Sequence, residues 1–462
     1  MSERLSPVFR PLKGKNAPLP KGFIWGAGTS AVQIEGAANQ DGKGESIWDR
    51  FASIKGNIQD GSIPDVACDH YNRVEEDVKL MKELGLPAYR FSISWPRILP
   101  EGTGRVEQRG VDFYKKLVDS LLRIDIQPLV TLYHWDLPQK LEDEGGWTNR
   151  ETADHFAEYT GIVAKALGDQ VKFWTTLNEP WVQAIPGYVL GVNAPGRKDW
   201  SQGLAAAHNL LLAHGKAVAV IRKNSKDSKV GIVLNLAPGY PYTDTQEDKD
   251  ATKRHDGHFN RWFLDPVFKK SYPEDMLDVY KNYRPEIKDK DFSTIGTSID
   301  YLGVNYYMPW LVRNCKDTVP LGFKNFSESP TDKTIITDTG WAVHPEGMSE
   351  LLIRLTNDYE IPEMYVTENG AAFPDVVEDG KVHDKKRKHY IKEHIKAVSY
   401  AVDRGVPVKG YILWSAMDNW EWGCGFTKRF GAMRVDYETQ KRTIKDSGIL
   451  FRNLIENNGV VE

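Results

Sequence analysis

Short apolar runs alternate along the chain with longer stretches in which apolar residues recur every three or four positions. The short runs are rich in β-branched and aromatic residues, which is typical of strands. We predict eight strands: Phe23–Gln33, Ala88–Trp95, Gln127–Trp135, Val171–Asn178, Val230–Asn235, Tyr301–Tyr307, Met364–Glu368 and Val408–Trp414. The longer stretches have the period of amphipathic helices. They are Val74–Leu84, Val111–Leu122, Thr152–Leu167, Gly203–Ile221, Glu346–Tyr359 and Lys388–Val402.

This alternation predicts parallel strands joined by crossover helices. Eight repeats in a chain of 462 residues favour a closed (β/α)₈ barrel over an open sheet. No low-complexity linker interrupts the series, so we expect residues 1–462 to form a single barrel domain, with residues 1–20 as an N-terminal extension.

The long segments without a regular pattern all follow predicted strands, and they would therefore gather at the C-terminal face of a barrel, where such folds build their sites. These segments are Ala37–Cys68, Trp181–Ser201, Leu236–Arg254 and Met308–His344. Polar and aromatic residues also mark the predicted strand ends: Gln33, Arg90, His134, Asn178, Glu179, Asn305, Tyr307, Glu368 and Trp414. One site at the barrel mouth would account for all of them.

Two acidic motifs stand out among these strand ends. Glu179 lies in Thr175-Thr176-Leu177-Asn178-Glu179-Pro180, and Glu368 lies in Thr367-Glu368-Asn369-Gly370. Two carboxylates on separate strand ends are what the hydrolysis of a glycosidic bond requires, one to protonate the leaving oxygen and one to attack or stabilise the sugar carbon.

Composition narrows the classes of partner. Lys and Arg number 60 against 64 Asp and Glu, a net charge of −4 without a long basic run, which argues against nucleic acid or an anionic membrane as the main partner. The cysteines, Cys68, Cys315 and Cys424, are few and widely spaced, so we expect buried free thiols rather than disulfides or a zinc site. The N-terminus does not resemble a secretory signal, and no stretch reads as a membrane span, so a cytoplasmic protein is expected.

At several of its motifs the chain resembles glycoside hydrolase family 1, the β-glucosidase family, from about Phe23 to Asn453. The motif around Glu179 resembles that family's acid/base motif, and Val366-Thr367-Glu368-Asn369-Gly370 resembles its nucleophile motif. Further matches, in family order, are Phe23-Ile24-Trp25-Gly26, Gln33-Ile34-Glu35-Gly36, Tyr89-Arg90-Phe91-Ser92, His134-Trp135-Asp136-Leu137-Pro138, Asn305-Tyr306-Tyr307, Trp414-Ser415 and Asp418-Asn419-Trp420-Glu421-Trp422.

The resemblance implies roles for the matching residues. Glu368 would be the nucleophile, kept ionised by Arg90 and Tyr307, and its charge would raise the pKa of Glu179, the general acid and then base. Asn178 would contact the sugar 2-hydroxyl, and Asn305 would support the pair. The sugar-binding residues would be Gln33, His134, Trp135, Asn178, Trp414, Glu421, Trp422 and Phe430. The leaving-group subsite would include Trp181, Asn235 and Trp341.

Three positions bear on the substrate. Val32 stands where relatives usually carry an aromatic residue or His, and Cys424 where a polar or aromatic residue is commoner, so both are expected to affect pocket shape. A carboxylate at Glu421 would repel a phosphorylated sugar and accept hydrogen bonds from the 4- and 6-hydroxyls instead.

The resemblance therefore implies a retaining β-glucosidase that acts on cellobiose, short cello-oligosaccharides and aryl or alkyl β-glucosides, with side activity on β-galactosides and β-fucosides and with transglycosylation. No metal or organic cofactor is implied, and a monomer or homodimer is expected. Two alternatives stay open: a catalytically silent sugar-binding relative, and an unrelated metal-dependent barrel enzyme. The second would need a His/Asp/Glu cluster at strand ends, which His134 alone does not provide.

Overall fold

The computed structural model describes residues 18–327 and 334–460, and its centre is a closed barrel of eight parallel strands. The neighbours around the barrel are β1-β13-β10-β7-β5-β4-β3-β2, closing between β1 and β2. Their bounds are β1 Ile24–Gly28, β2 Ala88–Ser92, β3 Gln127–Tyr133, β4 Phe173–Asn178, β5 Lys229–Asn235, β7 Tyr301–Asn305, β10 Met364–Asn369 and β13 Val408–Trp414. The predicted (β/α)₈ barrel is confirmed. Most of the predicted extension 1–20 lies outside the described residues.

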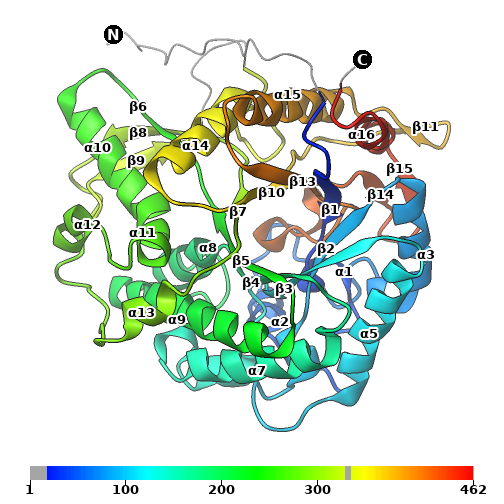
Figure 1. Ribbon diagram of the computed structural model, residues 1–462, viewed down its shortest axis with the longest axis horizontal. Helices are drawn as coiled ribbons and strands as arrows, with labels where there is room; N and C mark the ends of the chain where they lie inside the picture. Colours follow the sequence, from blue (N-terminus) through cyan, green and yellow to red (C-terminus); the bar gives the residue numbers. More distant parts are fainter. Residues whose placement is uncertain (1–17, 328–333, 461–462) are drawn as a thin grey trace.

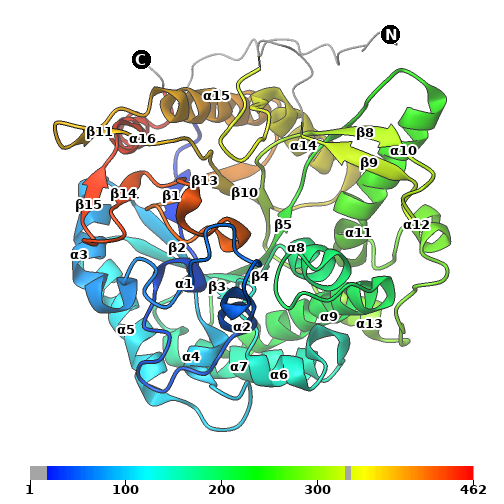
Figure 2. The same ribbon diagram turned by 180° about the vertical axis from the view of Figure 1, so that it is seen from behind.

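Amphipathic helices surround the strands (Figures 1 and 2). The long ones are α3 His70–Glu83, α5 Gln108–Leu122, α7 Thr152–Leu167, α9 Trp200–Asn224, α14 Pro345–Asp358, α15 Lys385–Val402 and α16 Asp446–Glu456. Their apolar faces and the outward side chains of the strands form the main core. A second, smaller cluster fills the barrel itself, from Ala88, Leu129, Phe173, Tyr301, Tyr365 and Ile412. This packed interior leaves the mouth of the barrel as the place for a site.

Helix α9 is long and apolar enough to cross a membrane by length and composition, with a mean hydropathy of 1.4 over its most apolar window, so the expectation that no stretch qualifies is wrong. However, 78% of that window is buried inside the protein, where α9 packs along α7 and α13. Its apolar character is that of a central core helix.

Several predicted strands end earlier than expected, because the chain turns at the barrel mouth. β1 stops at Gly28, and the chain begins the short helix α1 (Ala31–Ile34) after Ser30, so Gln33 lies on a helix and not on a strand. β3 stops at Tyr133, two residues before Trp135, whose φ of +77° is incompatible with a strand.

The segments between and after the barrel strands contain further, mostly shorter elements that the sequence pattern did not indicate. The helical ones are α2 Ile47–Ser53, α4 Trp95–Ile98, α6 Gln139–Asp143, η1 Gly146–Thr148, α8 Pro180–Ala184, η2 Ile185–Leu190, α10 Gln246–Asp256, η3 Gly257–Arg261, α11 Trp262–Phe268, α12 Glu274–Val279, α13 Asp291–Ile295 and η4 Trp422–Thr427. The strands form a three-stranded sheet and two hairpins: β6 Gly239–Pro241, β8 Trp310–Asn314, β9 Phe323–Phe326, β11 Val377–Glu378, β12 Lys381–Val382, β14 Met433–Val435 and β15 Arg442–Ile444.

The three cysteines are free, and they differ in burial. Cys68 is fully buried, and burial raises the pKa of its thiol, whereas Cys315 and Cys424 are partly exposed. The expectation of three buried thiols is therefore correct for Cys68 only.

Candidate active site

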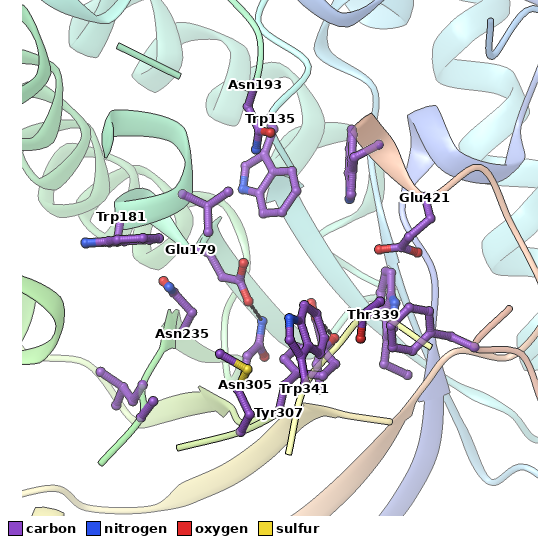
Figure 3. A pocket seen from close by; sticks show the side chains of 18 of the residues that line it. Trp135, Glu179, Trp181, Asn193, Asn235, Asn305, Tyr307, Thr339, Trp341 and Glu421 are labelled. Atoms are coloured by element: carbon purple, nitrogen blue, oxygen red, sulfur yellow. Dashed lines mark hydrogen bonds between the residues drawn. The ribbon is translucent and has the colours of Figure 1, made fainter. Parts of the chain in front are cut away.

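A cavity of about 450 Å³ opens at the C-terminal ends of the barrel strands, and both motif carboxylates line it. Glu179 follows β4 and begins α8, while Glu368 lies near the end of β10. Figure 3 shows Trp181 and Asn235 beside Glu179, with Glu421 on the opposite side of the cavity. Both carboxyl side chains are almost completely buried, with exposed fractions of 5% and 4% for the two residues.

Glu368 is held by one donor on each carboxylate oxygen. Arg90 Nη1, from β2, lies 2.6 Å from Oε1, and the Tyr307 hydroxyl lies 2.7 Å from Oε2. Burial and the charge of Glu368 raise the pKa of Tyr307 well above 10, so that hydroxyl keeps its proton and donates it. Because a cation and a neutral donor both favour an anionic acceptor, these contacts stabilise the ionised form of Glu368.

Glu179 lies in surroundings that favour its protonated form. Burial raises the pKa of its carboxyl to about 8, and the nearby charge of Glu368 adds to that effect. One hydrogen bond acts in the opposite direction: Asn305 Nδ2 lies 2.6 Å from Oε1 and favours the carboxylate. The two carboxyl groups thus have contrasting surroundings: the contacts of Glu368 favour the carboxylate, whereas burial of Glu179 favours the protonated acid.

Asn178 connects the surroundings of the two carboxyl groups. Its Oδ1 accepts hydrogen bonds from Arg90 Nη2 at 2.6 Å and from Asn305 Nδ2 at 3.2 Å. Its Nδ2 lies 3.0 Å from His134 Nε2 and must donate there, because the Asn178 oxygen faces Arg90. Asn178 itself lies behind the lining residues and is 1% exposed.

His134 is a neutral donor that faces the cavity. Burial and the charge of Arg90 lower its pKa well below 6.5. Since Nε2 accepts from Asn178, the ring proton resides on Nδ1, which has no partner within the described part of the chain. A buried N–H without a partner at a cavity wall is suited to binding a hydroxyl group of a ligand.

Aromatic rings form much of the cavity wall. The rings of Trp414 and His134 are stacked at a centroid distance of 5.8 Å, and Trp422 lies 4.5 Å from Trp135. Phe430 packs against Trp414, and Trp341 lies 5.3 Å from the ring of Tyr307. Flat apolar faces beside polar groups suit a sugar ring, which has both C–H faces and hydroxyl edges.

Glu421 lines one side of the cavity, and Gln33, which does not line it, donates a hydrogen bond to the Glu421 carboxyl group. Gln33 Nε2 donates to Asn419 Oδ1 at 2.8 Å and to Glu421 Oε2 at 3.2 Å. Burial, followed by the charge of Glu368, raises the pKa of Glu421 to about 8. The expected repulsion of a phosphate by an ionised Glu421 is therefore weak at neutral pH.

Most of the predicted site residues line the same cavity. They are His134, Trp135, Glu179, Trp181, Asn235, Asn305, Tyr307, Trp341, Glu368, Trp414, Glu421, Trp422 and Phe430. Gln33, Arg90 and Asn178 do not line it but contact residues that do. Of the two unusual positions, Cys424 lines the cavity, whereas Val32 faces a separate small pocket beside Glu35 and Arg97, so its expected effect on the cavity is not a direct one.

The sequence reasoning missed other lining residues, which lie in the segments after the strands: Val182, Asn193, Leu236, Ala237, Phe259, Met308, Trp310, Thr339 and Gly423. Leu236, Ala237 and Met308 directly follow Asn235 and Tyr307, so proximity to those two residues was an available signal. Phe259 and Trp310 come from η3 and β8, which no pattern indicated.

No group of three or more His, Cys, Asp and Glu side chains in residues 18–327 and 334–460 is arranged to hold a metal ion. The metal-dependent alternative therefore lacks a ligand set in this part of the chain.

A barrel whose mouth holds paired carboxyl groups, neutral polar donors and aromatic walls defines a glycoside-hydrolysing class of protein. The family model for glycosyl hydrolase family 1 matches residues 15–460, and the chain belongs to that family.

Relatives match along almost the whole chain. β-Glucosidase A of Acetivibrio thermocellus is 49% identical over 445 residues, which cover 95% of this chain and 98% of that protein. The 1,4-β-D-glucan glucohydrolase of Thermotoga neapolitana is 48% identical over 446 residues, covering 96% and 99%. The solved structure of the Thermotoga maritima β-glucosidase in complex with deoxynojirimycin superposes with a TM-score of 0.93 at 48% identity, covering 96% and 100% of the two chains.

Proposed function

We propose that this family 1 glycoside hydrolase is a retaining β-glucosidase, which removes terminal non-reducing β-D-glucosyl residues from cellobiose, short cello-oligosaccharides and aryl or alkyl β-glucosides. The chain is an enzyme of the β-glucosidase class, since a relative with that activity in its name is 49% identical over 95% of the chain. The observation that supports the mechanism best is the contrast between Glu368, held by Arg90 and Tyr307, and Glu179, whose pKa is raised to about 8 in the same cavity.

In the first step, a carboxylate oxygen of Glu368 forms a bond to the anomeric carbon while the bond to the leaving-group oxygen breaks. Glu179 gives its proton to that oxygen, so the aglycone leaves as a neutral alcohol. The negative charge of Glu368 is consumed in the ester of the glycosyl-enzyme, and Glu179 becomes a carboxylate.

In the second step, Glu179 acts as a base. The charge on Glu368 no longer raises its pKa, and the hydrogen bond from Asn305 Nδ2 stabilises the carboxylate. Glu179 takes a proton from water, whose oxygen attacks the anomeric carbon and releases Glu368. Both carboxyl groups return to their starting states, and the sugar leaves with its β-configuration.

The glucosyl unit would be bound between Trp414 and the polar groups around it. His134 Nδ1 is an available donor at the cavity wall, and Asn178, behind the wall, orients the His134 ring through its own N–H. Glu421, which Gln33 holds in place, can exchange hydrogen bonds with the 4- and 6-hydroxyls. None of the described residues that line the cavity is Lys or Arg, so a 6-phosphate would find no countercharge there. An unphosphorylated glycoside is therefore the proposed substrate.

The aglycone would lie between Trp181, Asn235 and Trp341, which line the same cavity. Phe259 and Trp310 extend this apolar wall. Activity on β-galactosides and β-fucosides and transfer to a second sugar are also proposed. A panel of kcat/KM values for aryl β-glucoside, β-galactoside, β-fucoside and cellobiose on one enzyme preparation would rank the substrates.

Two measurements test the mechanism. The wild-type enzyme should release nitrophenol from an aryl β-glucoside, and Glu368→Ala should abolish that release while circular dichroism shows an intact fold. An NMR time course should show β-glucose as the first product; α-glucose first would rule out retention. Glucoside binding without nitrophenol release by the wild type would instead favour a catalytically silent relative.

A further inference from the structure

Thr367 lies directly before Glu368, and the mechanism above gives it no task. In a regular strand, successive side chains point to opposite faces. The pairing of β10 with β7 shifts its register between Val366 and Glu368. At this irregularity the side chains of two successive residues, Thr367 and Glu368, both contact residues of the site. Thr367 Oγ1 donates to Asn305 Oδ1 at 2.8 Å, while Glu368 contacts Arg90 and Tyr307.

We propose that Thr367 is a positioning residue, which fixes the amide orientation of Asn305 and so keeps Asn305 Nδ2 donating to Glu179. The proposal rests on the proposed function of Glu179 as acid and base. Thr367 lies beside Glu368 on β10, but its proposed effect is on Glu179, which follows a different strand, β4.

The orientation of the Asn305 amide follows from the donors around it. Arg90 can only donate, so it fixes Oδ1 of Asn178 toward itself. Oδ1 of Asn178 can then accept only from the nitrogen of Asn305, which also faces Glu179 Oε1 at 2.6 Å. The oxygen of Asn305 must point the other way, where the Thr367 hydroxyl is its donor.

The surroundings of Thr367 are built to hold this hydroxyl in place. Thr367 is 2% exposed and Asn305 is 1% exposed, so exchange with bulk water is restricted. Gly303 on β7 leaves the space: a Cβ atom there would lie 2.8 Å from Thr367 Oγ1 and from its methyl group.

Removing the hydroxyl leaves the buried Asn305 oxygen without a donor, which is costly. The amide cannot simply turn over, because its oxygen would then face the Asn178 oxygen that Arg90 holds. Without the Thr367 donor the amide instead loses its anchor on one side, and its hydrogen bond from Nδ2 to the Glu179 carboxylate weakens. The variant therefore favours protonated Glu179 and raises its pKa. The other charged or titratable groups around Glu179 are Glu368 on β10, Arg90 on β2, Tyr307 after β7, His134 after β3, and Glu421; Thr367→Val changes none of them.

The test is the pH dependence of kcat/KM for an aryl β-glucoside, which reports the free enzyme. In Thr367→Val the alkaline limb of the pH profile of kcat/KM should move to higher pH by about one unit. In Thr367→Ser, which keeps the hydroxyl, the limb should stay at the wild-type pH. Thr175→Val is the matched control, because it removes a buried hydroxyl of β4 that contacts Tyr301 and not Asn305.

An unshifted limb in a folded Thr367→Val enzyme, or an equal shift in Thr367→Ser or Thr175→Val, would overturn the inference. If Thr367→Val does not fold, Thr367→Ala, which also lacks the hydroxyl and carries neither γ-methyl group, gives the same reading. A wild-type enzyme without activity on the glucoside would contradict the proposed function instead, so the two failures are distinguishable.

Discussion

Glu179 and Glu368 are chemically identical side chains whose different behaviour comes from their contacts. Glu368 has a guanidinium and a phenol hydroxyl on its oxygens, whereas Glu179 has a single amide and lies beside another carboxylate. Glu179 also begins helix α8 with a φ of +49°, in a backbone region that few residues other than glycine adopt. Such local strain is typical of functional positions and here places the acid at the cavity wall.

The pH dependence of the enzyme should follow Glu179. Because its raised pKa is about 8 and the proposed mechanism requires its proton, kcat/KM should fall as the pH rises through that value. Glu421 has a similar raised pKa, so the control is Glu421→Gln: the alkaline limb should persist in this variant at lower activity. Disappearance of the limb in Glu421→Gln would assign the titration to Glu421.

At this scale the sequence was informative where motifs exist. The position of Glu179 and Glu368 at strand ends predicted that they share one cavity. The family resemblance supplied the role proposed for each and indicated Arg90 and Tyr307 as partners of Glu368. Burial raises the pKa of Glu179 more than the charge of Glu368 does. The sequence could not predict this, because the burial depends on how completely the loops cover the cavity.

At the scale of elements, a buried ion network holds the segment that carries Glu421. Asp418, on this segment, contacts both Lys445 and Arg429, and Lys445 also contacts Asp375, which follows β10. Arg387 of α15 joins Asp375 and Asp384 to the same network. Three cations and three carboxylates thus connect the chain after Glu368 with the chain around Glu421.

Lys445→Met should therefore destabilise the protein strongly. Removing the lysine leaves Asp375 and Asp418 buried with one cation fewer, and breaking a buried pair in this way costs about 3–5 kcal/mol. Lys409→Met, at an exposed position of β13, should change the free energy of unfolding by less than about 0.5 kcal/mol. Denaturant unfolding of both variants measures the difference, and equal effects would contradict a structural role for the network.

Long periodic elements were predictable from the sequence, and short ones were not. The helix predicted at Thr152–Leu167 has the observed bounds of α7, because sixteen residues are enough to define a helical period. Elements such as α8 and β8 have five residues each, and contacts with the rest of the barrel stabilise them rather than their own sequence pattern.

For the whole molecule, the main constraint is barrel closure. The first strand, β1, pairs with the last barrel strand, β13, through five residue pairs from Ile24↔Gly410 to Gly28↔Trp414. Two segments that are 386 residues apart in the sequence (410 − 24) therefore depend on each other. Counting eight strands in the sequence predicted that closure, but not its register, because register is set by side chains that meet only in the folded state. We propose on this basis that the chain is one domain.

A single domain should lose its secondary structure and its activity in one transition. Gly26→Ala tests this, because its added Cβ would lie 2.6 Å from the carbonyl oxygen of Ala88 across the β1–β2 pair. The variant should shift the thermal transitions followed by circular dichroism and by residual activity downward together.

Gly161→Ala is the matched control for that shift. Gly161 lies on helix α7, and an added Cβ would make only an ordinary contact there, 3.5 Å from the side chain of Val220 on α9. Its transitions should stay in place or rise slightly, since alanine favours helices more than glycine does. Separate transitions by the two probes in the wild type would indicate more than one domain.

The aromatic wall of the cavity has a further, optical consequence. Six of the fourteen tryptophans line this single cavity: Trp135, Trp181, Trp310, Trp341, Trp414 and Trp422. Glucose does not absorb in the near ultraviolet, so a change in protein emission on its addition should report indole rings whose surroundings have changed. The enzyme is thus its own fluorescent probe, and occupancy of the cavity can be titrated without a labelled ligand or a chromogenic leaving group.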